Sequence, residues 1–281
     1  GVDDNKSEQR RVIANEVDVC VRCNECPRMV RLYGACLERF CIISEFVDGG
    51  TLDGRIHGDG NAPMALLEVL QVARDIAEGL AFLHPQLIHR DLKPQNVLLH
   101  RSGRAKIIDF GLGRVNDNPL RTHASTHVAG TAAYMSPEQC DGHVSQKVDI
   151  YALGVILNEC LSGEMPFHNY SNPMQVQVAV LMRQERPAVA VGCPKAVRVT
   201  IERCWHTEPS KRPTAVELVF ILDHLIQAEI GLREKDASTR PNSVTATASQ
   251  GEGGPPPATP GMNGSKAAAT FAARPIHSVT L

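Results

Sequence analysis

The chain has 281 residues, of which 43% are hydrophobic and 21% are charged, so it can bury a sizeable core and still dissolve in water. Its 29 basic and 31 acidic side chains leave a formal charge of -2, which argues against a general nucleic-acid-binding protein and against a polybasic membrane anchor. No apolar run approaches the roughly 18 residues that a membrane-spanning helix needs.

The start of the chain and its cysteines bear on where the protein acts. Residue 1 is Gly rather than Met, and residues 1–11 contain no apolar stretch, so we see no secretory signal. The nine cysteines are an odd set scattered through predicted helices and strands, unlike the paired framework of a small secreted domain. We therefore expect mostly reduced thiols in a cytoplasmic protein.

Short apolar runs predict strands nearer the front of the chain, and longer periodic runs predict helices that dominate its second half. In residues 63–84, apolar residues such as Leu66, Leu70 and Leu80 recur three or four apart, which predicts an amphipathic helix. Residues 147–161 are apolar on nearly every side, which predicts a buried helix. The other expected elements are helices at 194–205 and 213–228 and strands at 30–33, 41–46, 97–99 and 106–108. Helices and strands that segregate in this way predict an α+β fold.

The composition changes near Gly231. From there to the C-terminus Ala, Ser, Thr, Gly and Pro predominate, with the run GGPPP at 253–257 and Phe271 as the one aromatic residue. Such a segment cannot bury enough apolar surface to offset the entropy lost on ordering it. We expect residues 231–281 to be a disordered tail.

Three motifs carry the chemistry. Residues 89–96 read HRDLKPQN, residues 109–111 read DFG, and residues 130–138 read GTAAYMSPE. In this order and spacing they resemble the catalytic loop, magnesium loop and activation segment of the eukaryotic-type protein kinase superfamily. The resemblance implies a mainly helical large lobe at 49–230. It also implies an incomplete small lobe at 1–48, with helix C, two strands and the hinge.

The resemblance implies ATP-dependent phosphoryl transfer, which needs in-line positioning and neutralisation of phosphate charge more than covalent help. Asp91 would accept the proton of the substrate hydroxyl, and Lys93 would reach the transferring phosphoryl group. Asn96, also part of the catalytic set, and Asp109 would ligate Mg²⁺ through hard oxygen atoms. The implied nucleotide contacts are Glu45 and Val47 in the hinge, Leu98 in the 97–99 strand and Glu16 on helix C.

Further residues match structural positions of such a domain. Asp149 resembles the buried aspartate that anchors the catalytic loop, because burying a carboxylate without partners is costly. Arg212 resembles the arginine that pairs with Glu138, because a guanidinium suits bidentate carboxylate geometry. His89 and Arg90 support the catalytic loop from within its own motif.

The activation segment contains candidate switches. It comprises Asp109, Phe110, Gly111, Thr122, Ser125, Thr126, Thr131 and Glu138. A phosphate on Thr122, Ser125 or Thr126 would form charge-assisted bonds to Arg90 and order the loop. The alternative is that these are ordinary loop hydroxyls, which are common.

Small residues indicate the substrate class. The KPQN ending of the catalytic loop resembles the serine/threonine version, and Thr131 after Gly130 agrees with it. The LYGAC run at 32–36 and the region of Trp205 resemble the tyrosine-kinase-like group of serine/threonine kinases. We therefore expect a protein substrate with a Ser or Thr acceptor and no nucleic acid partner. The oligomeric state stays open.

The printed chain has no G-x-G-x-x-G loop and no Val-Ala-x-Lys strand before residue 20. Lys6 is too close to Glu16 to be its ion-pair partner, so we expect this chain to bind ATP weakly and to transfer phosphate poorly. Two explanations stay open. The chain is a fragment of an ordinary kinase, which Gly1 favours, or it is a truncated kinase-like binding module.

A run of cysteines resembles part of a metal-binding pattern. Cys20, Cys23 and Cys26 are spaced three apart and Pro follows the third. An iron–sulfur run needs a fourth Cys where this chain has Val30, with Pro after that one. The kinase register places Cys20 and Cys23 on helix C, so we expect them to act as small hydrophobes.

Overall fold

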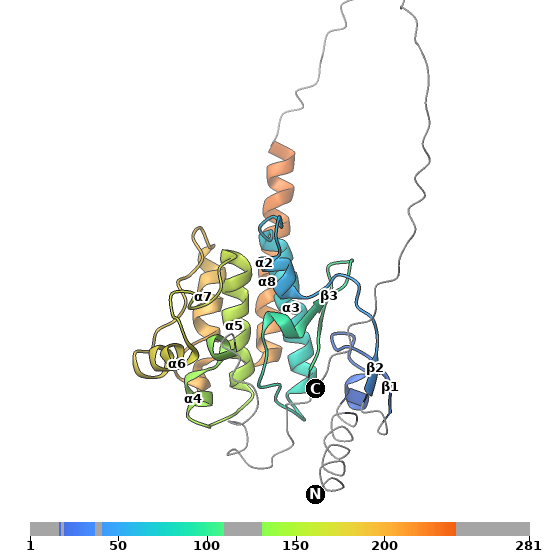
Figure 1. Cartoon of the computed structure of the whole chain (residues 1–281). Coiled ribbons are helices and arrows are strands. Elements are labelled where there is room, and N and C mark those ends of the chain that lie inside the picture. The colour runs from blue at the N-terminus through green and yellow to red at the C-terminus, as the bar shows by residue number, and fades with distance from the viewer. Residues whose placement is uncertain (1–16, 18–19, 37–40, 110–130, 240–281) are drawn as a thin grey trace, which may run out of the picture. The chain divides into compact units, whose positions relative to one another are not determined.

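A computed structural model describes residue 17 and residues 20–36, 41–109 and 131–239 (Figure 1). Its helices, in chain order, are α2 (Leu52–His57), α3 (Leu66–Leu83), α4 (Pro137–Cys140), α5 (Lys147–Ser162), α6 (Pro173–Met182), α7 (Lys195–Cys204) and α8 (Ala215–Thr239). Its strands are β1 (Leu32–Cys36), β2 (Cys41–Ser44), β3 (Val97–Leu99) and β4 (Ala105–Ile107). The predicted α+β class is confirmed.

The strands form two antiparallel hairpins. In the first, β1 pairs with β2 and a bulge lies between Leu32 and Gly34. In the second, β3 pairs with β4, so that Leu98 lies opposite Lys106. The strand predicted at 30–33 begins later, at Leu32, because the Val30 amide donates instead to the carbonyl of Ile107 in β4, at 3.1 Å.

The segment before β1 is tied to the large helical part of the chain. The amide of Ile107 donates to the carbonyl of Arg28 at 2.8 Å, and Met29 bridges Ile107 in parallel. The Arg28 side chain continues to α3, where its Nε lies 2.7 Å from Glu78 Oε2 and 3.3 Å from Asp75 Oδ1. Backbone and ion pairs together therefore hold this segment in register with β4.

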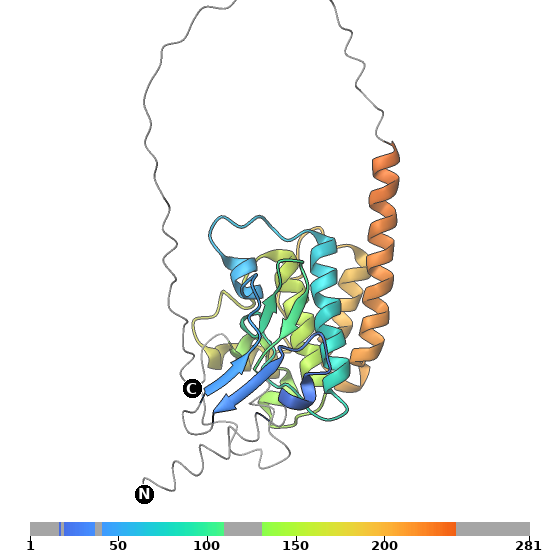
Figure 2. The ribbon, with the colours of Figure 1, turned by 90° about the vertical axis from the view of Figure 1, so that its right-hand side faces the viewer.

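The core lies among the long helices, which Figure 2 shows packed side by side next to the β3–β4 hairpin. α3 lies between α5 and α8 and buries Leu70, Ile76 and Leu80, the face that the sequence periodicity predicts. α5 is buried along almost its whole length, as its apolar composition predicts. This packing gives the catalytic loop a rigid base.

Several elements differ from the sequence expectations. α2 and α6 were not anticipated, because each is short and lacks a long amphipathic repeat. α8 continues past Ala228 and Gly231 to Thr239, so the predicted tail boundary at 230/231 falls inside a helix. The run GLREKDAST after Ile230 is polar but contains no proline, and only one glycine, to end a helix. None of the described helices is both long and apolar enough to cross a membrane.

Candidate active site

The loop at residues 89–96 is anchored from below by Asp149. This carboxylate lies in the first turn of α5 and is 1% exposed. Its Oδ2 accepts from the His89 amide at 2.9 Å and from His84 Nε2 at 3.0 Å, and its Oδ1 accepts from the Arg90 amide at 2.8 Å. These bonds satisfy the buried charge and hold Arg90 at a φ of 68°. Asp149 is thus buried and in direct contact with the loop.

The side chains of Asp91, Lys93 and Asn96 converge above this anchor. Lys93 Nζ donates to Asp91 Oδ2 at 2.8 Å, and Asn96 Nδ2 donates to the same oxygen at 3.2 Å and to the Asp91 carbonyl at 2.8 Å. Asp91 Oδ1 is buried and has no hydrogen-bond partner within the described ranges. One carboxylate oxygen is therefore held by two donors, and the other is left to accept a proton or a hydrogen bond.

Asp109 is positioned through its neighbour Ile108. The Ile108 amide donates to the Asn96 carbonyl at 3.0 Å, and His89 Nε2 donates to the Ile108 carbonyl at 3.0 Å. His89 Nδ1 accepts from the Asp91 amide at 3.3 Å, which agrees with a proton on Nε2. Asp109 follows with a φ of 62° and an exposed side chain. Ile108 therefore links Asp109 to the catalytic loop, because its amide and its carbonyl both form hydrogen bonds to residues of that loop.

The residues predicted to contact the nucleotide base lie in or beside the β3–β4 hairpin. Glu45 forms an ion pair with Lys106 of β4, which lies directly opposite Leu98 of β3. Two residues after Glu45, Val47 is buried, and Leu98 is half-buried. The structure therefore places Glu45 close to the strand that carries Leu98, with Val47 next along the hinge.

Arg212 and Glu138, the two residues that the resemblance pairs, form an ion pair. Both terminal nitrogens of Arg212 donate to the two carboxylate oxygens, at 2.6 and 2.8 Å, and the arginine is 2% exposed. Its guanidinium also lies 5.1 Å from the ring centre of Tyr151, and its Nη1 donates to the Lys147 carbonyl. The pair joins the end of the 130–138 motif to α5 and to the start of α8.

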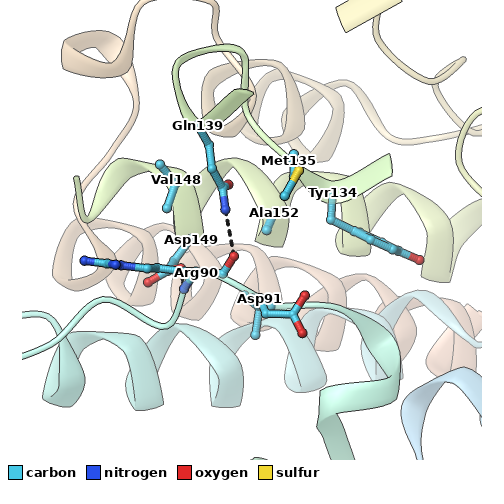
Figure 3. Close-up of a pocket in the computed structure, with 9 residues that line it drawn as sticks. Arg90, Asp91, Tyr134, Met135, Gln139, Val148, Asp149 and Ala152 are labelled. Atoms are coloured by element: carbon cyan, nitrogen blue, oxygen red, sulfur yellow. Dashed lines mark hydrogen bonds between the residues drawn. The ribbon is translucent and has the colours of Figure 1, made fainter. Parts of the chain in front are cut away.

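A small cavity lies between the catalytic loop and the segment that contains Tyr134 and Gln139 (Figure 3). The Gln139 side chain extends toward the loop, and its Nε2 donates to the Arg90 carbonyl at 2.8 Å. In Figure 3 the Asp91 carboxylate and the Arg90 guanidinium point in opposite directions. The side of the loop that bears the Asp91 carboxylate is therefore separate from the side that bears the Arg90 cation.

Three polar contacts of this lobe were not anticipated from the sequence. Glu159 of α5 is 1% exposed and accepts from Tyr134 Oη and from His57 Nε2, both at 2.8 Å. Burial raises the pKa of Glu159, and the two hydrogen bonds oppose that shift. Gln95 Nε2 donates to Asp53 Oδ1 at 2.6 Å. His57 and Asp53 lie on α2. The position of α2 directly after the hinge is the one sequence feature that could have indicated these two residues.

Some predicted site residues fall outside the described ranges. Glu16, Phe110, Gly111, Thr122, Ser125 and Thr126 are among them. Thr131 begins a short 3-10 turn, but only its backbone is described.

The cysteine run has the character of a small apolar cluster. Cys20 and Cys23 lie in a helical stretch at 20–23, and Cys23 and Cys26 are buried. Burial raises the pKa of the Cys23 thiol to about 11 and also raises that of Cys26. Within the described ranges, no three His, Cys, Asp or Glu side chains gather as a metal site. Protonated, buried thiols are poor metal ligands.

Comparison with known proteins places this arrangement in a family. The family model described as protein tyrosine and serine/threonine kinase matches residues 2–222. Mitogen-activated protein kinase kinase kinase 7 of Bos taurus is 34% identical over 226 residues, which covers 78% of this chain and 38% of that protein. The dual specificity protein kinase shkC of Dictyostelium discoideum is 33% identical over 206 residues, covering 71% of this chain and 40% of that protein. LysM domain receptor-like kinase 10 of Oryza sativa subsp. japonica is 35% identical over 234 residues, covering 74% and 38%.

A helical lobe with the Asp91, Asn96 and Asp109 motifs on and beside one hairpin defines the large lobe of a protein kinase. The chain belongs to the protein tyrosine and serine/threonine kinase family. It spans about two fifths of the length of the curated relatives that it matches.

Proposed function

We propose that this chain is the catalytic part of a serine/threonine protein kinase that transfers the γ-phosphoryl group of ATP to a Ser or Thr hydroxyl of a protein. The observation that supports the proposal is the hydrogen bonding of the two Asp91 carboxylate oxygens. Its Oδ2 is held by Lys93 and Asn96, whereas its Oδ1 is buried without a partner in the described chain. A carboxylate oriented in this way is prepared to accept one proton from a substrate.

Each residue of the cluster then has its own task. Asp91 Oδ1 accepts the proton of the substrate hydroxyl. Lys93 holds Asp91 Oδ2 in the resting site, and its ammonium is close enough to neutralise charge on the transferring group. Asn96 fixes the loop through the Asp91 carbonyl. The task of Asp149 is indirect, since it sets the backbone from which Asp91 projects.

The donor set fits a magnesium–nucleotide complex. Because Asn96 Nδ2 is committed to Asp91, Asn96 Oδ1 is the atom that would ligate the metal, together with the exposed carboxylate of Asp109. An amide oxygen and a carboxylate leave the remaining positions to water and phosphate oxygens, the set that Mg²⁺ prefers. When bound, Mg·ATP supplies the phosphoryl group and its metal neutralises the phosphate charge. Glu45, Val47 and Leu98 would hold the base, and Glu16 on helix C would act only through an ion-pair lysine.

The remaining assignments extend this proposal. Arg90 would receive a phosphate on Thr122, Ser125 or Thr126, and Thr131 would line the acceptor side. The partners are protein substrates rather than nucleic acids, and the site of action is the cytoplasm. The printed chain has no Gly-rich loop before residue 20, so it binds ATP weakly on its own. A kinase-like binding module is the second candidate, and the retained Asp91 and Asp109 argue against it.

The test compares two isosteric variants of the whole chain. With Mg·ATP and a mixture of Ser- and Thr-containing peptides, Asp91→Asn should lower phosphate transfer by about 10³-fold. Asp59→Asn, which changes an exposed loop carboxylate, should leave it unchanged. Equal transfer by the two variants would exclude Asp91 as the base.

A titration addresses the nucleotide site. Thermal shifts should give a dissociation constant for Mg·ATP of about 1 mM, and Asp109→Asn should weaken it further. Micromolar affinity would contradict the proposed impairment. Complete indifference to Mg·ATP would favour the binding module.

A further inference from the structure

Two cysteines lie opposite each other at the end of the first hairpin. Cys36 is the last residue of β1 and Cys41 is the first residue of β2, and the antiparallel register pairs them directly. Figures 1 and 2 show the two strands side by side. Directly opposed residues project to the same face of a sheet, so both side chains lie on one side of the hairpin.

The spacing of such a pair suits a covalent bond. Opposed residues of an antiparallel ladder have Cα atoms about 4.5 or about 5.5 Å apart, depending on the hydrogen-bonding position. Both values fall inside the range of about 4.4–6.8 Å over which disulfides form. The pairing continues through Ala35 and Ile42, so the two cysteines are held opposite each other by the ladder itself.

Accessibility distinguishes Cys41, one member of this pair, from the other cysteines, which are half-buried or buried. Cys41 is exposed and Cys36 is half-buried. Cys23 and Cys26 are buried, and burial raises the pKa of both thiols. Burial likewise raises the pKa of Cys140 to about 11 and of Cys204 to about 12, and it raises that of Cys160. A thiol must ionise to react, so these five are poor competitors for an oxidant.

We propose that Cys36 and Cys41 form a reversible disulfide when the protein meets a peroxide. The exposed Cys41 thiolate attacks one peroxide oxygen, the O–O bond breaks, and Cys41 becomes a sulfenic acid while one water leaves. The Cys36 sulfur then attacks the Cys41 sulfur, the S–O bond breaks and a second water leaves. Overall the two thiols lose two electrons and two protons, and hydrogen peroxide is reduced to two water molecules. A dithiol reductant reverses the bond by exchange.

The bond has a local consequence. A two-stranded hairpin is marginally stable in water, and a cross-link at its end restricts its opening. β2 leads directly to Glu45, whose amide donates to the Arg31 carbonyl at 2.9 Å. Oxidation therefore slows opening of the strand pair that leads into the hinge.

Trypsin tests the proposal directly. It cuts after Arg31, Arg39 and Arg55, which places Cys36 in peptide 32–39 and Cys41 in peptide 40–55. After treatment of the whole chain with hydrogen peroxide and blocking of remaining thiols, a non-reducing digest should contain these two peptides as one species. Its mass should equal their sum less two hydrogen atoms, and a dithiol reductant should separate them.

Variants provide the controls. Cys41→Ser should abolish the joined species, whereas Cys193→Ser, at a half-buried cysteine on another part of the surface, should leave it intact. Amide hydrogen exchange in 32–44 should slow on oxidation of the unsubstituted chain and not of Cys41→Ser. The proposal is overturned if Cys36 joins another cysteine or a second molecule, or if both peptides stay separate at peroxide levels that oxidise Cys193.

Discussion

The buried carboxylate of Asp149 accepts a hydrogen bond from the backbone amide of Arg90 at 2.8 Å, although the two residues are 59 positions apart in the sequence. Arg90 has a φ of 68°, a conformation that an arginine adopts only when surrounding contacts hold it. The same carboxylate accepts the amide of His89. α5 therefore sets the backbone path from which Asp91 projects, and the catalytic geometry depends on a residue outside the catalytic loop.

Replacing this carboxylate by an amide should be costly. Asp149→Asn keeps the shape, but its NH₂ group must face N–H donors, so at least one buried donor loses its partner. We expect the free energy of unfolding to fall by about 2–4 kcal/mol, as measured by urea denaturation. Asp59→Asn is the matched exposed control. Equal stability of the two variants would mean that the Asp149 hydrogen bonds contribute nothing to folding.

Arg212 should not tolerate lysine. Its guanidinium makes a two-bond contact with Glu138, donates from Nε to the His206 carbonyl at 2.8 Å, and covers the Tyr151 ring. A lysine ammonium can replace only part of this set. We expect Arg212→Lys to lower the unfolding free energy by about 2 kcal/mol.

The neighbouring Lys211 provides the comparison. It is 61% exposed and its ion pair with Glu208 lies on the surface. Lys211→Ala should therefore change the unfolding free energy by less than about 1 kcal/mol. A larger loss for Lys211→Ala than for Arg212→Lys would show that burial of the Arg212 pair is not what stabilises this corner.

The sequence predicted the parts of the site that are encoded by short motifs. The HRDLKPQN motif located Asp91, Lys93 and Asn96, because residues this close together in one loop also lie close together in space. The partner of Glu138 was also predictable, because a cation next to a late proline matches a known pattern. Helix lengths were less predictable, as α8 shows, because a polar helix surface and a polar tail have similar composition.

Other contacts between distant residues left no sequence signal. His57 and Glu159 are 102 positions apart, and neither belongs to a periodic pattern or a motif. Their contact arises only because the folded lobe brings the last residue of α2 to a side chain of α5. The ion pairs of Arg28 with Asp75 and Glu78 are similar, since neither carboxylate belongs to a recognised motif. Tertiary packing determines which of these charged side chains come into contact.

Replacing two helical glycines by alanine should change the free energy of unfolding in opposite directions. A Cβ on Gly154 of α5 would lie 2.6 Å from the Cβ of Cys204, so Gly154→Ala should lower the unfolding free energy by about 1–3 kcal/mol. A Cβ on Gly231 of α8 meets no atom within 4 Å, and Gly231→Ala should raise it by about 0.5–1 kcal/mol. Adding Cys204→Ala should not rescue Gly154→Ala, because alanine keeps the Cβ. Rescue would show that the sulfur, rather than the Cβ, makes the contact.

The buried Glu159 should make stability depend on pH. Burial raises its pKa above the ordinary value of 4.5, nearby Asp53 adds to the shift, and the hydrogen bonds from His57 and Tyr134 oppose it. The folded protein therefore favours the protonated acid more than the unfolded chain does. The stability that this group contributes is fully present below pH 4.5 and is lost as the pH rises through the folded-state pKa.

Glu159→Gln removes this titration while keeping an oxygen for Tyr134 and a nitrogen for His57. The unfolding free energy of the natural chain minus that of the variant should thus decrease as the pH rises from 4.5 toward neutrality. Urea denaturation of both proteins at a series of pH values measures the difference, and common effects of other carboxylates cancel. A difference that increases with pH would mean that the hydrogen bonds, and not burial, dominate at Glu159. In that case the ionised carboxylate would be the form that stabilises the contact between α2 and α5.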